Sequence, residues 1–96
     1  MQALLQAIAT MPFPVDAQRI FHGRGGRFPG CEHLSLDAYP PVLVLTSFAE
    51  LDEASIAAVQ TALQQRWSEI APSDQPFNFL LQTRGPGAQI ETRLMA

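Results

Sequence analysis

The sequence predicts an α+β fold: one mixed, mainly antiparallel sheet of about five strands, with a long helix packed on one face. Two observations lead to this prediction. Three short runs of strand-forming residues, 19–22, 33–37 and 42–45, are separated by turns that contain glycine or proline. An apolar stripe at helical spacing then runs through residues 52–70. The expected order of elements is α-β-β-β-α-β-β.

A short helix is expected near the N-terminus, over residues 2–9. Leu4 and Ile8 lie one helical turn apart and give this helix an apolar side. Pro12 and Pro14 follow, and each disfavours the α conformation of the residue before it, so the helix ends ahead of them. A helix of about two turns is marginal by itself and needs to pack on the sheet.

The three strand-like runs predict an antiparallel meander. Residues 33–37 alternate between polar and apolar, which is the period of a half-buried strand. Residues 39–41 contain two prolines and predict a turn. The run 42–45 is continuously apolar, so we expect this third strand to lie deep in the sheet and to be buried on both faces.

Residues 52–70 are expected to form the longest helix. Asp52 is the predicted N-cap, and Glu53 lies in the first turn, at the positive end of the helix dipole. Apolar side chains recur every three or four residues; they are Ile56, Val59, Leu63, Trp67 and Ile70. Pro72 ends the helix. We expect the apolar stripe, including Trp67, to be buried against the sheet.

Two further strands complete the predicted sheet. Residues 77–83 are expected to run parallel to the 42–45 strand through a right-handed β-α-β crossover. Residues 89–94 alternate in polarity and are expected to form an edge strand. The two faces of that edge strand carry Ile90, Thr92 and Leu94 on one side and Glu91 and Arg93 on the other.

The 96 residues are expected to form a single domain, with a helix and linker over 1–14 and the sheet with its long helix over 15–96. A hydrophobic content of 47% is enough to fill a core. The formal net charge of −3 argues against nucleic-acid binding by overall charge. There is no lysine, and three of the six arginines fall within residues 19–27, which makes that segment locally positive.

A cytoplasmic location is the expectation from the cysteine content and the N-terminal sequence. Cys31 is the single cysteine and cannot form an internal disulfide, which favours a reducing compartment. Residues 1–5 carry no basic charge, and no apolar run approaches the roughly 20 residues that span a bilayer. We therefore expect no membrane association.

The glycine-rich segment 23–27 is a candidate phosphate site. Glycines expose backbone N–H groups, and Arg24 and Arg27 can each bind phosphate through two N–H donors. Known dinucleotide and nucleoside triphosphate motifs lead from such glycines directly into a helix, whereas this segment leads into a strand. A plain connection between two strands is the favoured interpretation, and Arg24 and Arg27 remain the candidate RNA or phosphate contacts.

A metal site is not expected, although His22, Cys31, Glu32 and His33 are close in sequence. Zinc needs four ligands, or three and a water molecule, in tetrahedral geometry. Three of these residues are consecutive, and neighbouring side chains of a strand point to opposite faces. No residue is therefore assigned as a metal ligand.

No catalytic constellation is recognisable either. Cys31 would need an activating base or a positive environment, and no distant His or Asp completes a site around it, so a structural thiol is favoured. Asp37, close to Tyr39, is expected to cap a turn at a strand end rather than to act as a general base. We predict that the chain is not an enzyme.

Three segments of this sequence nevertheless resemble a known family. Residues 19–23 read as an Arg-x-x-His-Gly strand end, residues 29–37 as a Pro-Gly turn followed by an aliphatic-x-Asp strand, and residues 41–45 as an aliphatic strand that leads to a helix. This pattern, with a closing arginine at Arg84, resembles the domain that precedes the catalytic domain in class I S-adenosylmethionine-dependent RNA methyltransferases, including enzymes that modify 23S ribosomal RNA. The resemblance covers residues 18–94.

The departures from that family decide what the resemblance implies. The chain lacks the glycine-rich turn between strand and helix that holds S-adenosylmethionine. The segment 39–42 has two prolines but lacks the polar residue before them and the aromatic residue after them that form the family's catalytic motif. Cys31 follows glycine, unlike the Pro-Cys nucleophile of cytosine-C5 enzymes. No catalytic or cofactor-binding residue is carried over, and the cofactor is implied only for a parent enzyme.

Two functions remain open at this point. The resemblance implies a non-catalytic accessory domain that helps to position RNA beside a catalytic methyltransferase domain absent from this chain, joined in cis or in trans. RNA binding would then be weak and would involve Arg24 and Arg27. The alternative is a free-standing α/β adaptor for a protein partner, unrelated to methyl transfer. In either case the edge strand, through Ile90, Thr92 and Leu94, is the candidate surface for docking a partner or for self-association.

Overall fold

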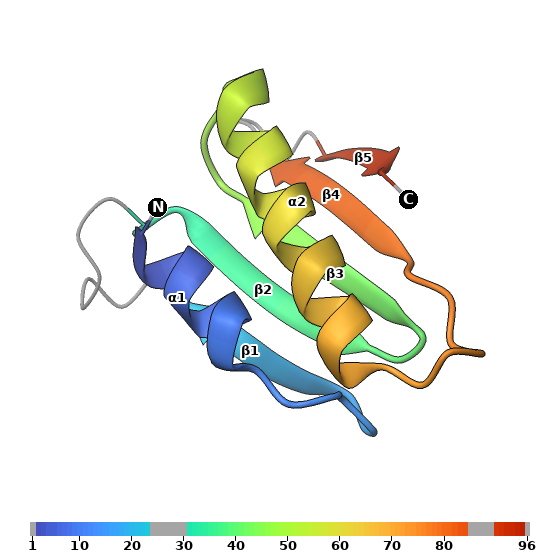
Figure 1. Ribbon diagram of the computed structural model, residues 1–96. Coiled ribbons are helices and arrows are strands. Elements are labelled where there is room, and N and C mark those ends of the chain that lie inside the picture. The colour runs from blue at the N-terminus through green and yellow to red at the C-terminus, as the bar shows by residue number, and fades with distance from the viewer. Residues whose placement is uncertain (1, 24–30, 85–89, 96) are drawn as a thin grey trace.

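The computed structural model describes residues 2–23, 31–84 and 90–95 and has one five-stranded sheet with two helices (Figure 1). The elements in chain order are α1 (Gln2–Thr10), β1 (Gln18–His22), β2 (Leu34–Tyr39), β3 (Val42–Ser47), α2 (Glu53–Ile70), β4 (Phe79–Arg84) and β5 (Ile90–Leu94). The predicted α+β class and the predicted element order are confirmed.

The strands lie side by side in the order in which they occur in the chain, β1-β2-β3-β4-β5. β1 pairs antiparallel with β2, β2 with β3, and β4 with β5. β3 and β4 pair in parallel, as expected, because α2 carries the chain back between them. β1 and β5 are therefore the two edges of the described sheet, which confirms the edge position predicted for the last strand.

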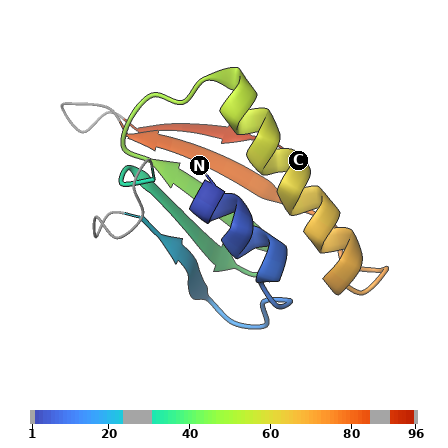
Figure 2. The same ribbon diagram turned by 60° about the vertical axis from the view of Figure 1, so that its left-hand side comes forward.

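Both helices pack on the same face of the sheet (Figure 2). Four of the five residues of the predicted apolar stripe are buried, Trp67 among them, whereas Ile70 at the end of α2 is only half-buried against this core. The buried residues that face it from the strands include Leu36, Leu45, Phe79 and Leu81. Because α1 is short, it depends on this packing and on its neighbour α2 for stability.

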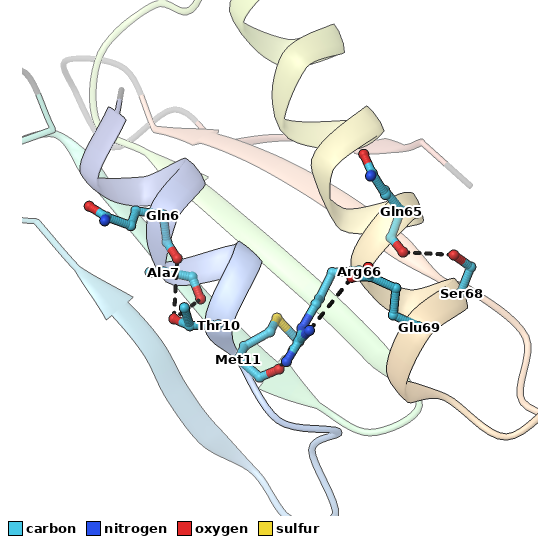
Figure 3. A network of polar contacts seen from close by, with 8 residues as sticks. All are labelled: Gln6, Ala7, Thr10, Met11, Gln65, Arg66, Ser68 and Glu69. Carbon is cyan, nitrogen blue, oxygen red and sulfur yellow. Dashed lines mark hydrogen bonds and ion pairs between the residues drawn. The ribbon is translucent and has the colours of Figure 1, made fainter.

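Arg66 of α2 connects the two helices. Its Nε donates a hydrogen bond of 2.9 Å to the carbonyl oxygen of Met11, which follows directly after α1, and its Nη1 lies 3.5 Å from a carboxylate oxygen of Glu69 (Figure 3). The carbonyl groups at the end of a helix lack intrahelical donors and carry partial negative charge, so a guanidinium is a favourable partner there. This contact explains how a nine-residue helix is held at a defined position.

The expectation that the third strand is buried on both faces is wrong. Leu43 and Leu45 of β3 are buried toward the helices, but Val42 and Val44 on the opposite face are only half-buried. A run of apolar residues indicates a central strand but does not show how many layers cover it. No helix of the described chain covers that second face, which we call the open face.

The N-terminus of α2 is capped as predicted. The backbone N–H of Ser55 donates a hydrogen bond of 2.8 Å to Oδ1 of Asp52. The side chain and the backbone N–H of Ser55 both hydrogen-bond to this carboxylate and hold the pKa of Asp52 below its ordinary value of 3.8. The cap therefore stabilises the fold when Asp52 is ionised.

Replacing Asp52 by alanine is expected to lower the melting temperature at neutral pH. The stabilisation is present above the unfolded-state pKa of 3.8 and is lost as the pH falls through the lower folded-state pKa. Asp52→Asn is the control, because asparagine caps a helix without titrating. Thermal unfolding followed by circular dichroism at a series of pH values measures both variants. An Asp52→Ala deficit of the same size at neutral pH and at about pH 2 would contradict this account.

Candidate functional site

The open face carries polar side chains from every strand of the sheet. Along each strand these side chains alternate with the core residues, because neighbouring side chains point to opposite faces. The strand pairing brings one residue from each strand into a continuous polar row: His22, Ser35, Thr46, Gln82 and Thr92. A parallel row beside it contains Arg19, Asp37, Val44, Leu80 and Leu94.

Arg19, Asp37 and His22 form a connected polar group on β1 and β2. Arg19 Nε donates a hydrogen bond of 2.9 Å to Oδ1 of Asp37, whose side chain is only 12% exposed. Nη1 of Arg19 lies 3.1 Å from Nδ1 of His22. A guanidinium can only donate, so Nδ1 of His22 is the acceptor in this contact. The carboxylate charge of Asp37 is neutralised within this group.

A hollow of about 230 Å³ lies in the open face. It is lined by Arg19, His22, Ser35, Asp37, Tyr39, Val44, Thr46, Phe48, Gln82 and Arg84. Ser35 and Thr46 are directly opposite each other on β2 and β3 and are only 3% and 8% exposed. Neither hydroxyl has a hydrogen-bond partner within the described residues, and both oxygens are accessible from the hollow. Polar groups in such positions bind water or a ligand.

Arg84 supplies the positive charge of the hollow. Its guanidinium carbon lies 5.7 Å from the centre of the Phe48 ring, a cation–π distance. Arg19, Arg66 and Arg93 each bind a carboxylate, whereas Arg84 has no such partner in the described part of the chain. Since Arg19 and Asp37 cancel each other, the hollow retains one net positive charge. It can therefore accept an anionic or hydrogen-bonding group next to an aromatic surface.

The residues predicted as functional from the sequence fall in two places. Arg24 and Arg27, the expected RNA or phosphate contacts, lie outside the described residues and remain predictions. Ile90, Thr92 and Leu94 lie on β5 with their side chains on the open face, since they pair with open-face residues of β4. Ile90 is 54% exposed and Leu94 is 73% exposed, so this strand presents apolar surface to solvent.

The sequence predicted that Asp37 caps a turn at the end of a strand, and this prediction is wrong. Asp37 lies within β2, opposite Arg19, and its carboxylate binds that guanidinium. The two residues are 18 positions apart in sequence, and only the pairing of β1 with β2 brings them together. The alternation of polar and apolar residues in 33–37 was the available signal for a separate polar face, but it does not identify partners on other strands.

Cys31 is buried in the hydrophobic core, which confirms the expected packing role for this thiol. No group of three or more potential metal ligands occurs in residues 2–23, 31–84 and 90–95. His22 faces the hollow, away from the buried thiol.

Comparisons with protein-family models, with curated proteins and with solved structures find no match for this chain. Neither described helix is both long enough and apolar enough to cross a bilayer. The open face is therefore interpreted from its own chemistry.

Proposed function

We propose that the chain is a non-catalytic accessory domain that holds RNA on its open face, beside the catalytic domain of an RNA methyltransferase. The family assignment rests on the resemblance of residues 18–94. The observation that carries the RNA role is the hollow, where the free hydroxyls of Ser35 and Thr46 lie near Arg84 and Phe48. Unpaired RNA bases stack on aromatic rings and guanidinium planes and hydrogen-bond through their edges, so these groups match single-stranded RNA.

The size of the hollow supports a polymer ligand. Its volume of about 230 Å³ is smaller than the roughly 300–1,000 Å³ of sites for independent small molecules. In this proposal the hollow takes one base, and the rest of the strand extends across the sheet. In this arrangement Arg84 binds a phosphate, and the hydroxyls and the Gln82 amide hydrogen-bond to the base or the ribose.

Binding by the isolated chain is expected to be weak. The net charge of −3 opposes RNA at long range, and Arg84 is one of few cations available to phosphate. Each phosphate contact to a single strand contributes a salt slope of about −0.7 in log–log form, so two or three contacts give a shallow salt dependence. The catalytic domain of the parent enzyme supplies the remaining affinity in this proposal.

Arg84→Gln is expected to weaken binding of a fluorescently labelled, unstructured RNA by about fivefold at low salt and to reduce the salt slope by about 0.7. Fluorescence anisotropy titrations at several salt concentrations measure both quantities. Arg93→Gln is the matched control, because it removes the same charge from the helix side of the same sheet. Thr46→Val keeps the shape of the side chain and should weaken binding without changing the slope.

Two outcomes would contradict the RNA role. Equal losses in Arg84→Gln and Arg93→Gln would mean that RNA senses overall charge and not the hollow. No measurable binding by the wild-type chain at low salt would remove the proposal altogether.

The adaptor function is the second candidate, and a different observation favours it: the exposed Ile90 and Leu94 on β5. An adaptor would use this edge and not the hollow. Ile90→Ser, which adds no charge beside Arg84, should then weaken capture of a protein partner while leaving RNA titrations unchanged, whereas Arg84→Gln should do the reverse.

A further inference from the structure

The outer edge of β5 has a defined set of backbone groups that find no partner among the residues the structure describes. Met95 N–H donates a 2.8 Å hydrogen bond to the carbonyl of Phe79 on β4. Hydrogen-bonded pairs recur at every second residue of an antiparallel ladder, so Glu91 and Arg93 also direct their backbone groups toward β4. By the same alternation, Ile90, Thr92 and Leu94 direct their N–H and C=O groups outward.

The parallel pairing on the other side of β4 supports this assignment. Leu43 N–H donates to the carbonyl of Asn78 at 2.9 Å. Even-numbered residues of β4 thus bond to β3, which leaves the odd-numbered residues to bond to β5.

β5 is the better of the two edges for adding a strand. At the opposite edge, β1 has an irregular register between Arg19 and Phe21. Such bulges interrupt the regular row of donors and acceptors and protect an edge from pairing. β5 pairs without interruption over its five residues, and all five are exposed.

We propose that a second copy of this chain pairs antiparallel with β5 around Thr92 and forms a two-fold symmetric dimer with one continuous sheet. Thr92 then lies opposite Thr92 of the second copy, and Ile90 lies opposite Leu94 of the second copy. These are the residues whose backbone groups point outward, so each one meets a partner with free donors and acceptors.

The side chains of β5 are self-complementary in this register. Glu91 lies opposite Arg93 of the second copy, and the symmetry axis repeats this ion pair. Ile90 and Leu94 form apolar cross-strand pairs on the open face. Opposite charges and apolar pairs facing each other stabilise antiparallel strands.

The charges also exclude the neighbouring registers. A shift by two residues in one direction places Glu91 opposite Glu91 of the second copy, and a shift in the other direction places Arg93 opposite Arg93. Like charges directly opposite are destabilising. Arg93 already binds Glu53 of α2 at 3.2 Å, and its guanidinium has further donors for a carboxylate of the second copy.

The proposed dimer does not depend on the RNA role. Residues opposite each other across a ladder point to the same face, so both open faces lie on one side of the combined sheet and all the helices lie on the other. The interface formed by two five-residue edges falls in the small, weak class below about 1,200 Å². Association is therefore expected to be reversible and concentration-dependent.

Sedimentation equilibrium on the full chain tests the proposal. The average mass of the wild type should rise from the monomer value of 10.5 kDa toward twice that value as concentration increases from about 5 µM to about 1 mM. Glu91→Arg and Arg93→Glu should each remain monomeric, because each places like charges opposite each other. An equimolar mixture of the two variants should dimerise again, because every charge then meets its opposite. Glu69→Arg, a comparable charge change on α2, should dimerise like the wild type.

The mixing experiment also shows that both variants are folded, since unfolded chains would not restore the dimer. A wild-type chain that stays monomeric over the whole concentration range would overturn the proposal. This holds also if the monomeric chain binds a catalytic methyltransferase domain through β5. Charge variants that dimerise as well as the wild type, or a mixture of folded variants that stays monomeric, would overturn the proposed register.

Discussion

Replacing Trp67 by alanine is expected to lower the free energy of unfolding by about 3–5 kcal/mol. The indole ring lies in the core between two phenylalanine rings, with ring centres 5.2 Å from Phe13 and 6.2 Å from Phe77. Its Nε1 donates a 3.2 Å hydrogen bond to the carbonyl of Gln75. The ring thus joins α2 to the segment between α1 and β1 and to the segment that leads into β4. Alanine would leave a cavity where these three segments meet.

Chemical denaturation followed by circular dichroism measures this loss in free energy. Circular dichroism is used because the alanine variant has no tryptophan fluorescence to follow. Trp67→Phe is the matched variant, because it retains most of the buried ring and loses the hydrogen bond. It should cost about 1–2 kcal/mol. An alanine variant no less stable than the phenylalanine variant would contradict the packing described for α2.

Replacing Gly23 by alanine is expected to destabilise the fold by about 3 kcal/mol or more, at the upper end of overpacking effects. A Cβ atom at this position would lie 1.8 Å from the backbone oxygen of Cys31. Neither side can yield easily, since Gly23 N–H donates to the carbonyl of Leu34 and Leu34 N–H donates to that same Cys31 oxygen. The end of β1 would have to separate from β2.

Thermal unfolding of Gly23→Ala measures this effect, and Ala17→Gly, which changes an exposed residue just before β1, serves as its control. A melting temperature of Gly23→Ala equal to that of the wild type would mean that the β1 end does not approach Cys31 so closely.

Local patterns were sufficient to predict the elements of this fold. The spacing of apolar residues in α2, the Asp52 cap and the alternation in 33–37 are all readable within one segment. The parallel pairing of β3 and β4 followed from the intervening helix, because such a crossover is the usual way to join parallel strands. The number of layers on the sheet could not be read in this way, since it depends on where α1 lies relative to α2.

The hollow could not be predicted because it depends on register between distant segments. Ser35 and Thr46 become neighbours only through the β2–β3 pairing, and Arg84 reaches Phe48 only because β4 lies beside β3. A single sequence indicates which residues alternate with the core but not which of them meet. For the same reason the sequence singled out Arg24 and Arg27, which are close in sequence, but not Arg84, whose place beside Phe48 depends on strand pairing.

The order of the strands has a consequence for the speed of folding. β1 pairs with β2, β2 with β3, and β4 with β5, and each of these pairs joins strands that follow one another in the chain. Both groups can therefore form with little loss of loop entropy. They meet along the parallel β3–β4 pair, which requires α2 and its flanking loops to be closed first. Non-local pairing of this kind is slow compared with hairpin formation. We therefore expect the folding rate to be most sensitive to side chains buried between β3, β4 and α2, such as Leu45, Leu63 and Leu81, and least sensitive to those of β5.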